Sequence, residues 1–333
     1  MKSTRPNMIA TTIGPWLRQA FLVTGLAIGV LAGAISASGQ TAQTFASPDD
    51  AVKGLVAAAR AHDRAALDRI LAPDANRLRS TDRVEENEEL TQFVARAVEK
   101  TELAKVNDAQ YTVEFGNDGW SFPVPIVKRG DAWAFDTSQG VDELLLRRVG
   151  RNELDTIRVT ATYAVAQWEY FLDGDWNNDG VQEFAQKLIS SPGQKDGLYW
   201  PSAEGEDASP LGPLVAYAHH EGYQGSRDAS GNIKPTPFHG YYLKVLKAQG
   251  PSAPGGAYSY LINGRMLGGF ALVAYPAVYG SSGVMTFILN QQGHIYEKNL
   301  GPNSEKIAPA MTAYNPDGSW ERVSVDIALA RAQ

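Results

Sequence analysis

The stretch NELDTIRVTATYAVAQWEYFLDGD, residues 152–175, decides the fold because it holds the strongest helical pattern in the chain. Its apolar residues recur at spacings of three, four and one: Leu154, Ile157, Ala161, Ala164, Val165, Trp168 and Leu172. This pattern predicts an amphipathic helix of about 20 residues that packs against a sheet rather than crossing a membrane. Asn152 is its predicted N-cap, and Asp155 takes the place of the capping-box acid.

Downstream of this helix the sequence predicts an antiparallel sheet. A short helix over residues 182–189 and a stretch rich in proline and glycine come first. Five segments with strand character then follow between turn residues: YYLKVL (241–246), AYSYLIN (257–263), FALVAYP (270–276), VMTFILN (284–290) and HIYEK (294–298). The pattern therefore indicates a long helix on an antiparallel sheet, over residues 141–325.

Upstream, three helices precede a second set of strands. Ser47 and Asp63 are predicted N-caps of the first two helices, and the third is expected over residues 88–101. Alternating residues then predict strands in the segments YTVEF, WSFPVPIVK and AWAFD, with the two prolines at a sheet edge or a bulge. We expect an α+β protein whose first domain, residues 47–140, is a small cone of helices on an antiparallel meander.

The first 39 residues have the composition of a secretory signal peptide. Lys2, Arg5 and Arg18 precede an apolar run over residues 20–35 that small residues follow. We expect cleavage, which leaves no stable membrane span; a retained anchor is the alternative. Cleavage changes the formal net charge from −7 to −7 − 3 = −10. The expected location is therefore periplasmic or secreted, and an acidic mature chain disfavours nucleic acid as a partner.

Two resemblances extend over much of the chain. The segments GRNELDTIRVTATYAVAQWEYF, FHGYYLKVLKAQGP and PGGAYSYLINGRMLGGFALVAYPAVYGSSGVMTFILNQQGHIYEKNLG resemble an uncharacterised bacterial exported-protein family, domain of unknown function 2950. The C-terminal half also resembles the globular domain of type IV pilins and pseudopilins, which place a long helix before an acidic loop and a sheet. This second resemblance implies a pilin-like fold and, in some members, calcium binding.

The acidic loop after the long helix is the candidate metal site. Asp175, Asn177 and Asp179 fit the first half of an EF-hand loop, and Glu183 stands at its ninth position. Gln186 occupies the twelfth position, where a bidentate Glu belongs. The alternative is a solvated turn that caps the next helix. Calcium is the one cofactor that these residues suggest.

The sequence identifies no catalytic motif. Neighbouring His219 and His220 point in different directions on a helix, so we expect them, with His239, to be surface residues. The chain has no cysteine and no nucleophile elbow or phosphate-binding loop. We therefore expect a non-catalytic role in binding or surface assembly, with an envelope protein or a glycan as partner. The alternative is a periplasmic hydrolase that uses carboxylates in an inter-domain cleft.

Overall fold

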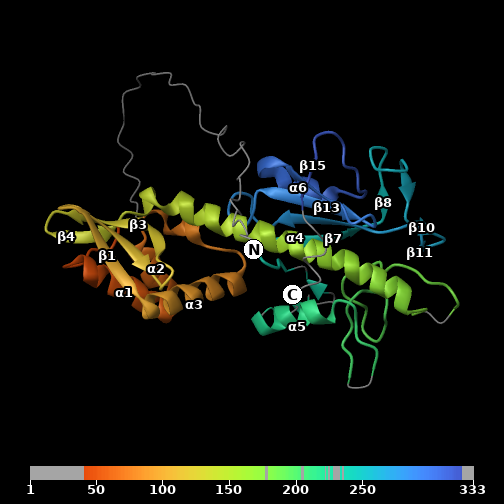
Figure 1. Ribbon diagram of the computed structural model, residues 1–333, viewed down its shortest axis with the longest axis horizontal. Helices are drawn as coiled ribbons and strands as arrows, with labels where there is room; N and C mark the ends of the chain where they lie inside the picture. Colours follow the sequence, from red (N-terminus) through yellow and green to blue (C-terminus); the bar gives the residue numbers. More distant parts are fainter. Residues whose placement is uncertain are drawn as a thin grey trace, which may run out of the picture. The chain divides into compact units, whose positions relative to one another are not determined.

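The computed structural model describes residues 41–176, 179–203, 206–221, 223, 226–227, 233–234 and 236–324 (Figure 1). Its first elements are α1 (Pro48–Arg60), α2 (Arg64–Ile70), the 3₁₀ helix η2 (Asp74–Leu78), α3 (Arg83–Glu99), β1 (Thr101–Asn107), β2 (Gln110–Phe115), β3 (Trp120–Arg129), β4 (Ala132–Phe135) and the 3₁₀ helix η3 (Thr137–Gln139). The predicted signal peptide, residues 1–39, lies outside the described residues.

The remaining elements begin with the long helix α4 (Val141–Asp173). They continue with α5 (Gly212–Glu221), β5 (Ser226–Arg227), β6 (Ile233–Lys234), β7 (Tyr241–Leu246), β8 (Ala248–Gln249), β9 (Tyr258–Ser259), β10 (Leu261–Ile262), β11 (Arg265–Met266), β12 (Ala271–Pro276), β13 (Met285–Asn290), β14 (Ile295–Asn299), η4 (Gly301–Asn303), α6 (Ser304–Ala310) and β15 (Glu321–Arg322). Helices and antiparallel sheets together confirm the predicted α+β class.

The predicted caps of the first two helices are present. The Ser47 hydroxyl accepts the backbone N–H of Asp50 at 3.1 Å, and the Asp63 carboxylate accepts that of Ala66 at 3.0 Å. Each side chain satisfies one of the free N–H groups at a helix start. These two local signals therefore placed α1 and α2 correctly.

Helix α3 begins at Arg83, five residues before the predicted start at Glu88. Asp82 is its N-cap and accepts the N–H groups of Val84 and Glu85, both at 3.1 Å. The first turn is acidic rather than apolar, so the periodic pattern missed it. The predicted C-terminal end of this helix also runs into β1, which begins at Thr101.

The first sheet has the order β1-β2-β3-β4, with every neighbouring pair antiparallel. Between β2 and β3 the register shifts from the pair Tyr111–Ile126 to the pair Val113–Phe122. Residues 123–125, which include both prolines of β3, fall within this irregularity. The bulge expected from the prolines is therefore present, although β3 lies inside the sheet and not at its edge.

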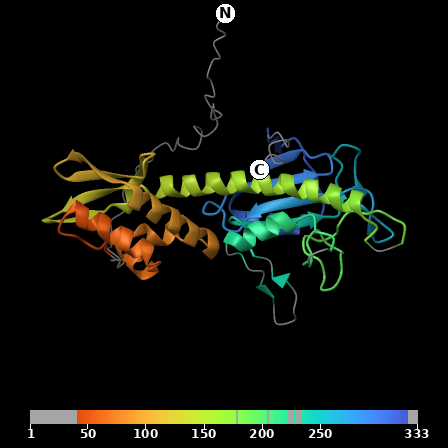
Figure 2. The ribbon, with the colours of Figure 1, turned by 60° about the horizontal axis from the view of Figure 1, so that its bottom comes forward.

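Helix α4 is one continuous helix of 33 residues and packs against both sheets (Figure 2). The predicted start at Asn152 is wrong, because Asn152 is buried in mid-helix and donates from its amide to the Ser282 carbonyl at 3.0 Å. Towards the first sheet, Arg148 of the same helix contacts Glu89. Tertiary contacts on both sides of Gly150 thus hold one helix where the local signals predicted a start at Asn152.

The second sheet has the order β15-β14-β13-β12-β7 and is antiparallel throughout. Strands β12 and β13 bury nearly all their side chains, and Tyr163 of α4 packs edge-on against Phe270 at 5.6 Å. The predicted long helix on an antiparallel sheet is confirmed. The segment AYSYLIN differs from prediction, because it forms β9 and β10 in two small two-stranded sheets.

The helix predicted over residues 182–189 does not form. The backbone N–H of Phe184 donates to the Met266 carbonyl at 2.9 Å, and that of Ala185 donates to the Gln167 side chain at 2.9 Å. Phe184 is buried and stacks on Phe171 at 4.6 Å. Long-range partners and aromatic packing therefore keep this segment extended.

Candidate ligand-binding site

A cavity of about 220 Å³ lies among the first helices, β3 and the start of α4. Helical periodicity directs one apolar face of each helix towards it. Its apolar lining consists of Leu55, Ala59, Leu67, Leu71, Ala75, Leu78, Leu90, Phe93, Trp120, Phe122 and Leu144. The cavity is therefore walled by aliphatic and aromatic side chains from α1, α2, η2, α3, β3 and α4 and the segments next to them.

Aromatic rings form one wall of this cavity. Phe93 of α3 lies 6.0 Å from Phe122 and 6.5 Å from Trp120, both on β3. The guanidinium groups of Arg96 and Arg147 lie over the Trp120 ring at 5.9 and 5.4 Å. Cations favour such positions because the ring face is electron-rich. The wall thus combines apolar rings with positive charge.

The charged part of the lining is predominantly basic. It consists of six arginines, Arg64, Arg79, Arg96, Arg147, Arg148 and Arg151, and three acids, Asp68, Glu86 and Glu89. Arginine suits the recognition of planar anions, because its N–H groups match two carboxylate oxygens. The lining therefore combines an apolar interior with an excess of anion-binding groups.

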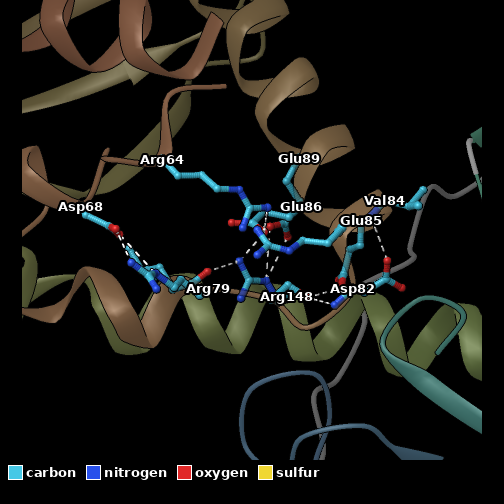
Figure 3. Close-up of polar contacts among 12 residues, drawn as sticks. Arg64, Asp68, Arg79, Asp82, Val84, Glu85, Glu86, Glu89 and Arg148 are labelled. Atoms are coloured by element: carbon cyan, nitrogen blue, oxygen red, sulfur yellow. Dashed lines mark hydrogen bonds and ion pairs between the residues drawn. The ribbon is translucent and has the colours of Figure 1, made fainter. Parts of the chain in front are cut away.

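Two of these arginines have one carboxylate each (Figure 3). Arg64 of α2 pairs with Glu86 of α3, and Arg79 pairs with Asp68. Arg79 also binds the second Asp68 oxygen at 3.3 Å through its Nε. The first pair holds α2 against α3. The second holds α2 against Arg79, which lies between η2 and α3.

Arg148 and Arg151, by contrast, share one carboxylate. The Nε of Arg148 lies 3.3 Å from both oxygens of Glu89, its Nη2 lies 2.8 Å from one of them, and Arg151 binds the other oxygen. The same Nη2 of Arg148 donates to the Leu78 carbonyl at 2.7 Å. Arg148 is only 7% exposed, and its Nη1 has no hydrogen-bond partner in the part of the chain that the structure describes. This buried donor is the most notable polar group of the lining.

A second group of buried polar residues lies where α3 begins. The Asp82 carboxylate accepts the Tyr223 hydroxyl at 2.7 Å and the Gly240 N–H at 3.3 Å. The Tyr223 oxygen accepts the His239 N–H at 3.1 Å, and burial together with the Asp82 charge raises the pKa of Tyr223. Asp82 thus connects the first helices to the segment before β7.

Glu85 lies one turn into α3 and is also buried. One of its oxygens accepts the Ser80 hydroxyl at 3.1 Å, while the other has no partner among the residues described. Burial, and then the negative charge of Glu89, raises the pKa of Glu85 to about 7, while Arg148 opposes the shift. Glu85 can therefore exchange a proton near neutral pH.

His239 is not the surface residue that we expected. Its side chain is 14% exposed, and its Nε2 lies 3.4 Å from Glu221 Oε2. It packs at 4.2 Å from Phe238 and adopts a positive φ of 46°. His219 is exposed as expected, and nothing is described of the His220 side chain. The fold thus leaves the His239 side chain only slightly exposed.

The acidic loop after α4 places its carboxylates around an arginine. Asp179 pairs with Arg265 at 2.6 Å, and Glu183 lies 3.4 Å from the same guanidinium. Asp175 accepts the backbone N–H groups of Asp179, at 3.0 Å, and of Gly180. Asn177, the fourth predicted ligand, lies outside the described residues.

In this arrangement Arg265 provides the positive charge that a cation would supply. Across the described ranges, no three His, Asp or Glu side chains are grouped as a metal site. The donor set as arranged does not fit an ion, because one guanidinium already neutralises two of its acids. Calcium binding at this loop stays a prediction that requires Arg265 to move away.

The sequence did not point to the cavity, because its charged residues are scattered from position 64 to position 151. The spacing of Arg147, Arg148 and Arg151 on a single helix is the one signal that could have drawn attention to it. Several aromatic residues of the C-terminal half fill a hydrophobic core with the second sheet, with Trp200, Tyr241 and Tyr260 at most 5% exposed.

No helix in the described ranges combines the length and apolarity that a membrane span requires.

Comparison with known proteins identifies the family. No curated protein and no solved structure matches the chain. The family of proteins of unknown function DUF2950 matches residues 42–323, which include both sheets and the whole of α4. The chain therefore belongs to the DUF2950 family.

Proposed function

We propose that this chain is an exported, non-catalytic binding protein whose first helices and first sheet hold a small apolar molecule. The observation that carries the proposal is the cavity of about 220 Å³ with its leucine and aromatic walls. Leucine and aromatic walls with a few polar groups around a space of this size are suited to a small apolar ligand. The basic and then apolar N-terminus supports export to the periplasm or the exterior.

The chemistry of the lining favours binding over catalysis. Among the described residues that line the cavity there is no Ser, Thr, Tyr, His or Lys. Its acids are tied to arginines in ion pairs, which leaves them poorly placed as bases. The residues present can hold and orient a molecule, and they lack the usual nucleophiles.

A neutral fluorescent probe tests this function. N-phenylnaphthylamine brightens in apolar surroundings, and we expect saturable binding to the wild-type protein. Leu90→Trp introduces an indole into the cavity lining and should weaken binding at least about tenfold. Val94→Trp, one turn further along α3 and outside the lining, is the matched control. Equal binding by both variants would contradict the proposal.

A hydrolase is the second candidate, and one observation favours it. Asp82 and Glu85 are buried carboxylates on neighbouring turns, and the raised pKa of Glu85, about 7, suits a general acid. Turnover of glycan substrates that is lost in both Glu85→Gln and Asp82→Asn, with folding intact, would establish this role. Probe binding that Leu90→Trp abolishes, without any turnover, would support the binding role.

A further inference from the structure

The unequal pairing of arginines in the cavity carries an inference about the ligand, and it rests on the proposed function. Arg79 pairs with Asp68, and Arg64 pairs with Glu86, which Arg83 approaches at 3.7 Å from outside the lining, whereas two lining arginines, Arg148 and Arg151, both bind Glu89. Two positive charges thus meet one negative charge at this end of the cavity. One further anion would neutralise the remaining positive charge of Arg148, Arg151 and Glu89.

The guanidinium of Arg148, a residue of the cavity lining, marks where that anion would bind. Arg148 is more than nine-tenths buried and lines the cavity, and Nη1 lacks an acceptor among the residues that the structure describes. A charged donor withheld from water is stabilised strongly when an acceptor is supplied. The bond from Nη2 to the Leu78 carbonyl holds the guanidinium in place for such an acceptor.

Neighbouring acids do not supply the missing charge. Glu86 already pairs with Arg64, and its carboxylate also lies 3.7 Å from Arg83. Glu85 acts on Arg148 through its charge, but burial raises its pKa to about 7. Near neutral pH a large fraction of Glu85 is therefore protonated. The excess of positive charge beside Arg148 and Arg151 thus persists under these conditions.

We propose that the ligand is an amphiphilic carboxylate, with its head group at Arg148 and Arg151 and its apolar chain against Phe93 and Phe122. Glu89 shows that these guanidinium groups accept a carboxylate, since both of its oxygens lie 3.3 Å from the Nε of Arg148. The remainder of the lining offers leucines and rings to a hydrocarbon chain. Fatty acids and other single-chain carboxylates belong to this class.

Displacement of bound N-phenylnaphthylamine distinguishes the head group from the chain. Decanoate and decanol have chains of equal length and differ in charge. We expect decanoate to displace the dye at a concentration at least about tenfold lower than decanol requires. Each methylene removed from the carboxylate should raise the required concentration about fourfold.

Matched variants on α4 test whether Arg148 and Arg151 cause the preference for decanoate over decanol. Arg151→Gln should reduce the preference for decanoate about tenfold and leave decanol displacement unchanged. Arg158→Gln, two turns along α4 and exposed to a similar extent (62% against 52%), should keep the wild-type preference. Arg148→Gln should abolish the preference where circular dichroism shows a folded protein. If that variant does not fold, Arg151→Gln decides.

The outcomes separate the two proposals. Equal potency of decanoate and decanol, with both blocked by Leu90→Trp, would overturn the carboxylate assignment and leave the binding function standing. A wild-type preference retained in Arg151→Gln would also overturn the assignment. Dye binding that is insensitive to Leu90→Trp would overturn both. A preference lost in Arg151→Gln and kept in Arg158→Gln would support the carboxylate ligand.

Discussion

Arg148 of α4 binds Glu89 of α3 with a nitrogen–oxygen distance of 2.8 Å, and this contact joins the long helix to the helices of the cavity. The same arginine reaches the Leu78 carbonyl in η2, so three elements meet at one buried guanidinium. Buried charges are costly unless they are paired, which makes this contact sensitive to the loss of either partner.

The first prediction concerns the stability that Arg148 provides. Arg148→Gln removes the positive charge and leaves Glu89 with Arg151 alone, so it should lower the free energy of unfolding by about 3 kcal/mol. Urea denaturation followed by circular dichroism measures the change. Arg158→Gln removes an exposed pair on the same helix and should cost less than about 1 kcal/mol. Equal losses in the two variants would contradict the account.

The second prediction is a pH dependence that originates at Glu85. Its pKa is raised from 4.5 to about 7 on folding, so the folded protein binds a proton more tightly than the unfolded chain does. Its contribution to stability is therefore complete below pH 4.5 and is lost as the pH rises through 7. The loss amounts to roughly 3 kcal/mol at most.

Glu85→Gln tests this dependence, since glutamine stays neutral at every pH. We expect the variant to be about as stable as wild type at acidic pH and more stable above neutral pH. Urea denaturation at several pH values gives the two curves. Curves that stay parallel across the range would show that Glu85 is not the titrating group.

A third prediction concerns the backbone at Gly240, whose N–H donates to Asp82. Its φ is +71°, and a Cβ there would lie 2.8 Å from Asn152 Nδ2 and from Ser282 Cβ. Gly240→Ala should therefore destabilise the protein through both strain and collision. Gly264→Ala, at a φ of +83° with no atom within 4 Å of the new Cβ, isolates the strain. Thermal unfolding should show the larger loss for Gly240→Ala, and similar losses would rule out the collision.

A fourth prediction addresses the acidic loop. Because Arg265 neutralises Asp179 and Glu183, its removal should leave the loop more negative and favour a cation. We expect Arg265→Ala to bind calcium more tightly than wild type in a calorimetric titration. The double variant with Asp179→Asn should lose the gain. Identical heats for wild type and Arg265→Ala would exclude this loop as a calcium site.

The sequence predicted those parts of the fold that local chemistry determines. Ser47 and Asp63 cap helices by bonding to N–H groups three residues away, so their neighbours suffice to identify them. Three strands of the first sheet and four of the second likewise followed from alternation and turn residues, whereas β1 and β15 were not predicted. Signals of this kind act over a few residues and can be read without the rest of the chain.

Predictions failed where distant residues decide the structure. Asn152 resembles an N-cap locally, yet its amide binds Ser282, which lies 130 positions away. The extended conformation of Phe184 likewise depends on Met266. The cavity depends on side chains that only folding brings together, so no window of the sequence contained it. Asp82 was missed as a cap because the turn after it is acidic rather than apolar.

The most direct measurement of the central claim is a crystal structure of the protein with bound decanoate. The account predicts a carboxylate within about 3.2 Å of a guanidinium nitrogen of Arg148 or Arg151 and a chain that contacts Phe93 and Phe122. Decanoate bound only outside the cavity, or an unoccupied cavity at saturating decanoate, would contradict it.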